Sequence, residues 1–122
     1  MRVVDASVVI AWAFEEDGAD LAEQLFEGGL ISTVNYTEII QRLMKRGETE
    51  EECLDCMKQS GLRVVDAGLE AAIIAARLHV YRDVSLGDRV CIALGEIASA
   101  PVVTADRYWA TLPLPAEIEL IR

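Results

Sequence analysis

Four carboxylates lie where the chain is expected to pass from one structural element to another: Asp5, Glu38, Asp88 and Asp106. Carboxylate oxygens suit Mg²⁺ or Mn²⁺, and a divalent ion removes the repulsion between acids that lie close together. A metal ion lowers the pKa of its bound water, and the hydroxide that forms can attack a phosphodiester. If the four acids converge, the sequence therefore predicts metal-assisted phosphodiester cleavage.

Hydroxyl groups accompany two of these acids. Ser7 follows Asp5 by two residues, and Thr104 precedes Asp106 by two. Each hydroxyl could hold a water or a phosphate oxygen, or it could serve only as a helix cap or bond to its own backbone. Any one acid could likewise serve only as a helix cap or complement the helix dipole. The metal-site hypothesis therefore rests on the joint placement of all four acids.

Short apolar runs predict the strands that would carry these acids. The predicted strands are residues 1–4, 30–34, 62–65 and 102–104, with 118–121 as a last edge strand. Helical patterns separate the strands. They cover residues 8–14, a second helix that follows the turn at 15–18 and ends near residue 26, and residues 36–46, 49–60, 69–79 and 85–98. Ser7, Asn35 and Thr49 are the predicted N-caps of the helices at 8–14, 36–46 and 49–60. Alternating strands and helices of this kind predict a three-layer α/β/α sandwich around a mostly parallel sheet of four to five strands.

The predicted sheet would bring the acids to one crevice. Ligands of open parallel sheets bind beyond the carboxyl ends of the strands, and Asp5 and Asp106 follow two strand ends. Glu38 and Asp88 are predicted in the first turns of helices, where the positive helix end favours an anion. Four elements could thus each deliver one carboxylate.

The composition predicts one soluble domain over residues 1–122. Of the chain, 52% is apolar and 26% charged, which is ample for a packed core. No apolar run is long enough to span a membrane and no signal peptide is visible, so we expect a cytoplasmic protein. An odd number of cysteines predicts reduced thiols, and the pair Cys53 and Cys56 lacks the further ligands of a zinc site.

Four segments resemble the PIN domain, and within that family the VapC-like toxins of type II toxin–antitoxin systems. The segments are Val3–Ile10, Tyr36–Ile40, Ser85–Asp88 and Val103–Arg107. Their order and approximate spacing are similar to those of the family and cover nearly the whole chain. One departure is Gly87, where the family often has Ala.

The resemblance implies a PIN-like fold and a metal-dependent endoribonuclease that leaves 5′-phosphate and 3′-hydroxyl ends on RNA. Mg²⁺ or Mn²⁺ would be held by Asp5, Glu38, Asp88 and Asp106, assisted by Thr104 and also by Ser7. It also implies a homodimer and a cognate antitoxin whose basic or aromatic tail occupies the groove.

The net charge of −10 is unusual for a protein that binds RNA, because phosphate contacts require Lys and Arg. A local basic rim would resolve this conflict, and the candidate RNA-binding residues are Arg42, Lys45, Arg46, Arg89 and Arg107. The alternative for these five is ordinary surface charge or ion pairing.

Two other functions remain open. The acidity would equally suit a catalytically inactive, PIN-like binding module for a cationic protein partner. An aspartyl phosphotransferase is less favoured, because such enzymes typically carry a second acid where this chain has Ser7.

Overall fold

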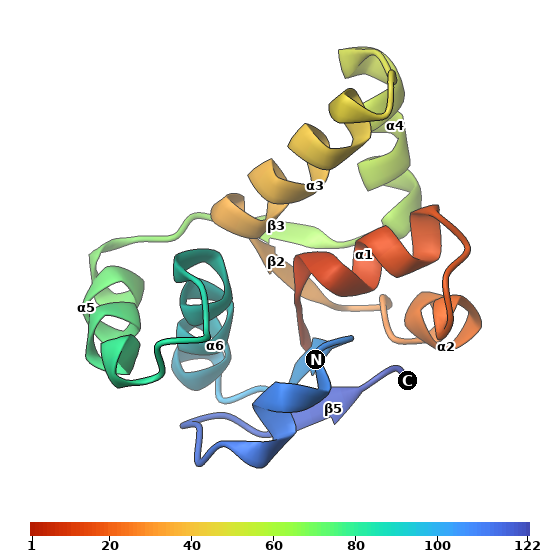
Figure 1. The fold of residues 1–122 in the computed structure, drawn as a ribbon. Helices are drawn as coiled ribbons and strands as arrows, with labels where there is room; N and C mark the ends of the chain where they lie inside the picture. Colours follow the sequence, from red (N-terminus) through yellow and green to blue (C-terminus); the bar gives the residue numbers. More distant parts are fainter.

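Five short strands form one parallel sheet in the computed structural model, which describes residues 1–122 (Figure 1). The strands are β1 (Val3–Val4), β2 (Leu30–Ser32), β3 (Arg63–Val65), β4 (Val102–Thr104) and β5 (Ile118–Leu120). Their order is β3-β2-β1-β4-β5, and every neighbouring pair is parallel. The predicted α/β class is confirmed, and the sheet is parallel throughout.

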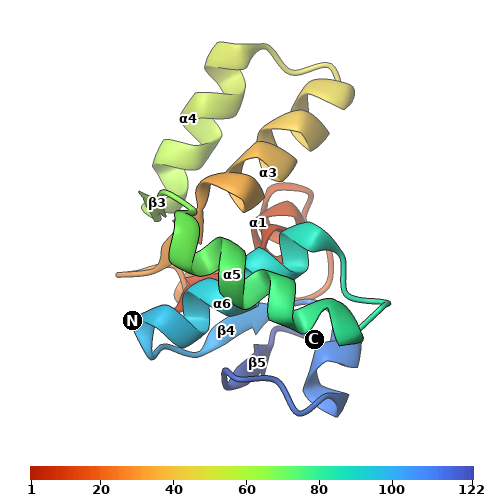
Figure 2. The ribbon, with the colours of Figure 1, turned by 90° about the vertical axis from the view of Figure 1, so that its left-hand side faces the viewer.

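Six helices surround this sheet. They are α1 (Ala6–Ala13), α2 (Ala19–Gln24), α3 (Thr33–Lys45), α4 (Glu50–Ser60), α5 (Leu69–Arg77) and α6 (Leu86–Ala98), with 3₁₀ turns η1 (Leu78–Val80) and η2 (Arg107–Thr111). Figures 1 and 2 show α3 and α4 as a pair that stands out from the body, and α5 beside α6. No helix is both long and apolar enough to cross a membrane.

Both faces of the three central strands, β2, β1 and β4, are buried. Val4 and Val103 pack into the cluster formed with α1 to α4, whereas Val3 and Val102 pack into the cluster formed with α6. Successive side chains of a strand point to opposite faces, so two adjacent valines serve two separate cores. This explains why β1 and β4 carry adjacent apolar residues rather than an alternating pattern.

Two helices begin earlier than predicted, because a residue at the end of the strand is itself the cap. The side chain of Asp5 accepts a hydrogen bond from the Ser7 N–H, so Ser7 is not the cap of α1. The side chain of Ser32 accepts from the Asn35 N–H at 3.0 Å and caps α3. The predicted strand to residue 34 and the Asn35 cap are therefore wrong, and Glu38 lies in the second turn of α3 rather than the first.

The other helix boundaries agree more closely with prediction. Thr49 and Glu52 form the predicted capping box at the start of α4. Ser85 caps α6 by accepting from the Asp88 N–H at 3.3 Å, which leaves Asp88 in the first turn. The alanine-rich helix ends at Arg77, slightly early, and tightens into η1, as helix ends often do.

Candidate active site

Three of the four predicted acids line one pocket of about 350 Å³. Asp5 comes from the end of β1, Glu38 from α3 and Asp88 from α6. The other lining residues are Ala6, Ser7, Ile10, Gln41, Arg42 and Lys45. The pocket adjoins the carboxyl end of β1, where the strand order reverses between β1 and β4, as expected for a ligand site in an open parallel sheet.

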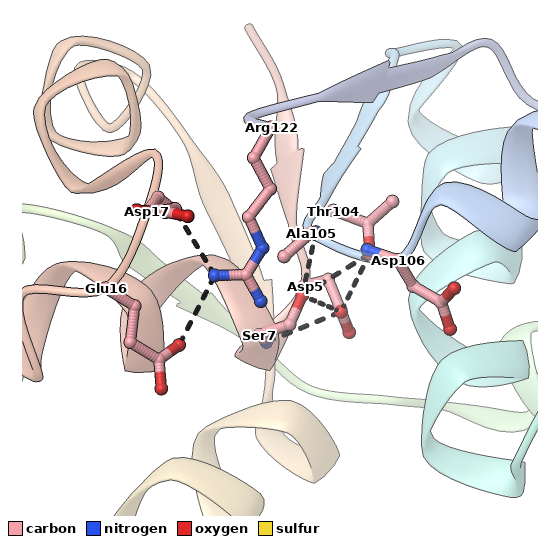
Figure 3. A network of polar contacts seen from close by, with 8 residues as sticks. All are labelled: Asp5, Ser7, Glu16, Asp17, Thr104, Ala105, Asp106 and Arg122. Atoms are coloured by element: carbon pink, nitrogen blue, oxygen red, sulfur yellow. Dashed lines mark hydrogen bonds and ion pairs between the residues drawn. The ribbon is translucent and has the colours of Figure 1, made fainter.

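A network of hydroxyl groups holds the Asp5 carboxylate (Figure 3). Asp5 is buried, and its Oδ2 accepts hydrogen bonds from Ser7 Oγ at 2.5 Å and Thr104 Oγ1 at 3.1 Å. These hydroxyls in turn accept from the N–H groups of Ala105 at 3.0 Å and Asp106 at 3.1 Å. Both hydroxyl protons are thus directed to Oδ2, while Oδ1 has no hydrogen-bond partner and is free to bind a ligand.

Glu38 is held on one side only. Its Oε1 accepts a hydrogen bond from Asn35 Nδ2 at 2.8 Å, and its Oε2 has no hydrogen-bond partner. Asn35 is fully buried and was missed as a site residue by sequence reasoning, which assigned it to a helix cap. The sequence does contain a signal for this role, because Asn35 lies three residues before Glu38 and this spacing places both side chains on one face of a helix.

Asp88 and Asp106 differ in their relation to the pocket. Asp88 is half-buried and lines it, whereas Asp106 is exposed and is not among the lining residues. The Asp106 carboxylate caps η2 by accepting from the Tyr108 N–H at 3.0 Å. It lies apart from the Asp5 carboxylate in Figure 3, but its charge still contributes to raising the pKa of Asp88.

The pocket disfavours negative charge. Burial raises the pKa of Asp5 to about 7, and the charges of Asp88 and Glu38 add to this effect. Hydrogen bonds from Ser7 and Thr104 lower the pKa but offset the rise only in part. Burial also raises the pKa of Asp88, and it raises that of Glu38 even though this side chain is largely exposed at the mouth of the pocket.

No ion pair neutralises these acids. The salt bridges of the structure lie elsewhere, between Arg2 and Glu119 and between Arg122 and Glu16. Carboxylates without compensation in a partly buried pocket, all with hard oxygen donors and no His, fit a divalent ion such as Mg²⁺ or Mn²⁺. The three acids line the pocket, but their side chains do not lie close enough together to form a preassembled metal site.

Two of the five predicted RNA-binding residues lie beside the acids. Arg42 and Lys45 line the same pocket from α3. The Arg42 guanidinium also lies 5.5 Å from the centre of the Phe14 ring, and that of Arg46 lies 4.1 Å from it. Arg46 is therefore engaged in a cation–π contact and does not line this pocket.

The remaining two predicted RNA-binding residues contact the backbone. Arg89 is half-buried and its Nη2 donates to the Tyr81 carbonyl at 3.0 Å. Arg107 is exposed and its Nε donates to the Arg122 carbonyl at 3.2 Å. Neither lines the pocket that holds the acids.

Comparison with known proteins identifies the fold. The family model of the PIN domain matches residues 2–113. No curated protein sequence gives a significant match.

Several solved structures are similar over almost the whole chain. A DNA-bound VapBC from Salmonella typhimurium has a TM-score of 0.76 at 18% identity, covering 99% of this chain and 98% of that one. VapC20 of Mycobacterium tuberculosis, a sarcin–ricin loop cleaving toxin, has a TM-score of 0.73 at 14% identity, covering 93% and 96%. VapBC-5 of the same organism, from a toxin–antitoxin family, has a TM-score of 0.64 at 24% identity, covering 98% and 96%.

At these identities the structural similarity demonstrates a shared fold. The family match, in contrast, extends over most of the chain and includes all four of the acids. It confirms the resemblance seen in the sequence, and the chain belongs to the PIN domain family.

Proposed function

We propose that this protein is a metal-dependent endoribonuclease and the toxin of a toxin–antitoxin pair. The observation that supports this most directly is the pocket lined by Asp5, Glu38 and Asp88, whose charges no ion pair compensates. The VapC20 neighbour, described as a toxin that cleaves the sarcin–ricin loop, supports RNA as the substrate class.

In this proposal Asp5, Glu38 and Asp88 hold Mg²⁺ or Mn²⁺, and Asp106 contributes from the edge of the site. When bound, the metal would supply an acidified water and stabilise negative charge on the phosphate. Asp5 Oδ1 and Glu38 Oε2 have no hydrogen-bond partner, so Asp5 and Glu38 each offer one unengaged oxygen.

The chain's own residues position these acids and the RNA. Ser7 and Thr104 assist by fixing Asp5 through Oδ2. Arg42 and Lys45 would draw RNA phosphates toward the pocket, with Arg46, Arg89 and Arg107 as more distant contacts. Cleavage by a metal-activated water would leave 5′-phosphate and 3′-hydroxyl ends.

A protein partner belongs to the proposal. VapBC-5 is a member of the VapBC family of toxin–antitoxin systems, and we propose a cognate antitoxin with a basic or aromatic tail for this chain as well. The net charge of −10 favours such a tail electrostatically. We also propose that the toxin is a homodimer.

The test is cleavage of total RNA by the purified protein with Mg²⁺ or Mn²⁺, with and without EDTA, followed by mapping of the ends. We expect the protein to cleave RNA and EDTA to abolish the cleavage. The Asp5→Asn and Asp88→Asn variants should not cleave RNA, although their circular dichroism spectra should match that of the wild type. Cleavage that persists in EDTA would contradict the proposal. Binding of a cationic peptide without any divalent-metal binding by calorimetry would favour the inactive binding module instead.

A further inference from the structure

We propose that Asn35 and Gly87 form a cradle that positions the Glu38 carboxylate for metal binding. Asn35 would act by its hydrogen bonds, and Gly87 by having no side chain. The inference rests on the proposed function, because it assumes that Glu38 is a metal ligand. In this scheme Asn35 and Gly87 are positioning residues that act through Glu38.

Both polar atoms of the Asn35 side chain make hydrogen bonds. Its Oδ1 accepts from Ser32 Oγ at 2.6 Å, and its Nδ2 donates to Glu38 Oε1 at 2.8 Å and to the Gly87 carbonyl at 3.2 Å. The opposite amide orientation would place Oδ1 against two acceptors, the Glu38 carboxylate and the Gly87 carbonyl, so the hydrogen bonds define the orientation.

This amide joins the two elements that deliver Glu38 and Asp88. Glu38 lies one turn along α3 from Asn35, and the Gly87 carbonyl belongs to the first turn of α6, directly before Asp88. Asn35 is fully buried, and a buried amide is costly unless its hydrogen bonds are made. One side chain thus contacts both the Glu38 carboxylate and the turn of backbone that precedes Asp88.

Helix capping alone does not explain Asn35. The Ser32 side chain already caps α3, and Asn inside a helix is a poorer helix former than Ala. Both donors of its amide are instead directed at the carboxylate of Glu38 and at α6. The two donor contacts thus serve the arrangement of the pocket, while the amide oxygen holds the capping hydroxyl of Ser32.

Gly87 provides the space for the carboxylate. A Cβ at this position would lie 2.7 Å from Glu38 Oε1, and 2.8 Å from its Cδ and Oε2. These distances are shorter than van der Waals contact, so a side chain at residue 87 would displace the carboxylate. Gly87 is not among the glycines with a positive φ, so space rather than backbone conformation accounts for glycine here.

The test is a double-mutant cycle on Mn²⁺ affinity, measured by isothermal titration calorimetry on the full chain. We expect Asn35→Ala and Gly87→Ala each to weaken Mn²⁺ binding about tenfold, the lower end of the range for residues that orient metal ligands. In a Glu38→Ala background, neither substitution should weaken it further. Gly87→Ala removes no hydrogen bond, so it remains informative if Asn35→Ala fails to fold.

Thr37→Ala is the matched control. Thr37 precedes Glu38, is exposed, and its hydroxyl donates only to the Thr33 carbonyl at 2.8 Å, so we expect unchanged Mn²⁺ affinity. Wild-type affinity in Gly87→Ala, or an equal loss in the Glu38→Ala background, would overturn the cradle. Absence of Mn²⁺ binding by the wild-type protein would instead contradict the proposed function itself.

Discussion

At the scale of single residues, hydrogen bonds hold the Asp5 and Glu38 carboxylates of the pocket through one oxygen and compensate their charge only in part. Asp5 is the clearest case, because two hydroxyl donors reach one of its oxygens and its pKa is nevertheless raised to about 7. Glu38 follows the same pattern, with one oxygen held by Asn35 and the other without a partner. Each acid is fixed through one oxygen, which leaves the other available.

The raised pKa of Asp5 predicts a pH-dependent stability in the absence of metal. Between the ordinary value of 3.8 and about 7, the folded protein retains a proton that the unfolded chain has lost. The free energy of unfolding should therefore decrease as pH rises through this window, by at most about 4 kcal/mol from Asp5. Glu38 and Asp88 act in the same direction, because their pKa values are also raised.

Urea unfolding in EDTA at pH 5 and pH 7 measures this effect. Asp5→Asn is the matched variant, since it removes the titrating group and retains a side chain of similar shape, and its unfolding free energy should depend less on pH. Equal pH dependence in the wild type and Asp5→Asn would show that the burial of Asp5 does not control stability in this range.

At the scale of elements, α3 contributes both signs of charge to the pocket. Glu38, Gln41, Arg42 and Lys45 all line it, and their spacings of three, four and seven residues place them on one face of the helix. In the proposed function a single helix would present an acid to the metal and two cations to the phosphates. Such an arrangement would reconcile the strongly acidic chain with the proposed nucleic-acid substrate.

Replacing these two cations predicts a specific change in salt dependence. The double variant Arg42→Gln with Lys45→Gln should bind single-stranded RNA more weakly, and the slope of log affinity against log salt should become less steep by roughly 1.4, for two lost phosphate contacts. Fluorescence anisotropy over a range of salt concentrations measures the slope.

A control with the same charge change separates local contact from net charge. Lys58→Gln with Arg77→Gln alters exposed cations of α4 and α5, neither of which lines the pocket of the acids. The slope should stay at its wild-type value in this control. If both double variants lower the slope equally, the two cations of α3 have no special role.

At the scale of the whole molecule, a net charge of −10 surrounds a pocket that itself contains uncompensated acids. A cationic segment of a partner protein would be attracted over long range and could compete with RNA at the pocket. The same field would weaken RNA binding at any surface other than the local rim formed by Arg42 and Lys45.

A synthetic arginine-rich peptide tests this field. It should inhibit RNA cleavage at low salt and lose potency as ionic strength rises, because screening shortens the range of attraction. A neutral peptide of equal length is the control, and the measurement is the concentration for half-maximal inhibition at several salt concentrations. Inhibition that does not depend on salt would argue against an electrostatic origin.

The sequence by itself determined the fold class and the acids of interest. Apolar runs such as Val102–Thr104 and the capping box of Thr49 and Glu52 are local signals, so the alternation of strands and helices could be predicted from neighbouring residues alone. The positions of Asp5 and Asp88 at element boundaries followed from the same signals. Helix starts were less predictable, because Ser32 takes over the capping role expected of Asn35.

Only the tertiary structure decided how these acids are held and which charges lie beside them. The hydrogen bond from Asn35 to the Gly87 carbonyl joins residues 52 positions apart in the sequence, and the hydrogen bond from Thr104 to Asp5 joins residues 99 positions apart. Such contacts depend on the strand order and on how the helices pack against the sheet, and neither is a property of local sequence. The four acids are therefore visible in the sequence, but the place of Glu38 inside α3, the hydroxyl network at Asp5 and the Asn35 cradle exist only in the folded chain.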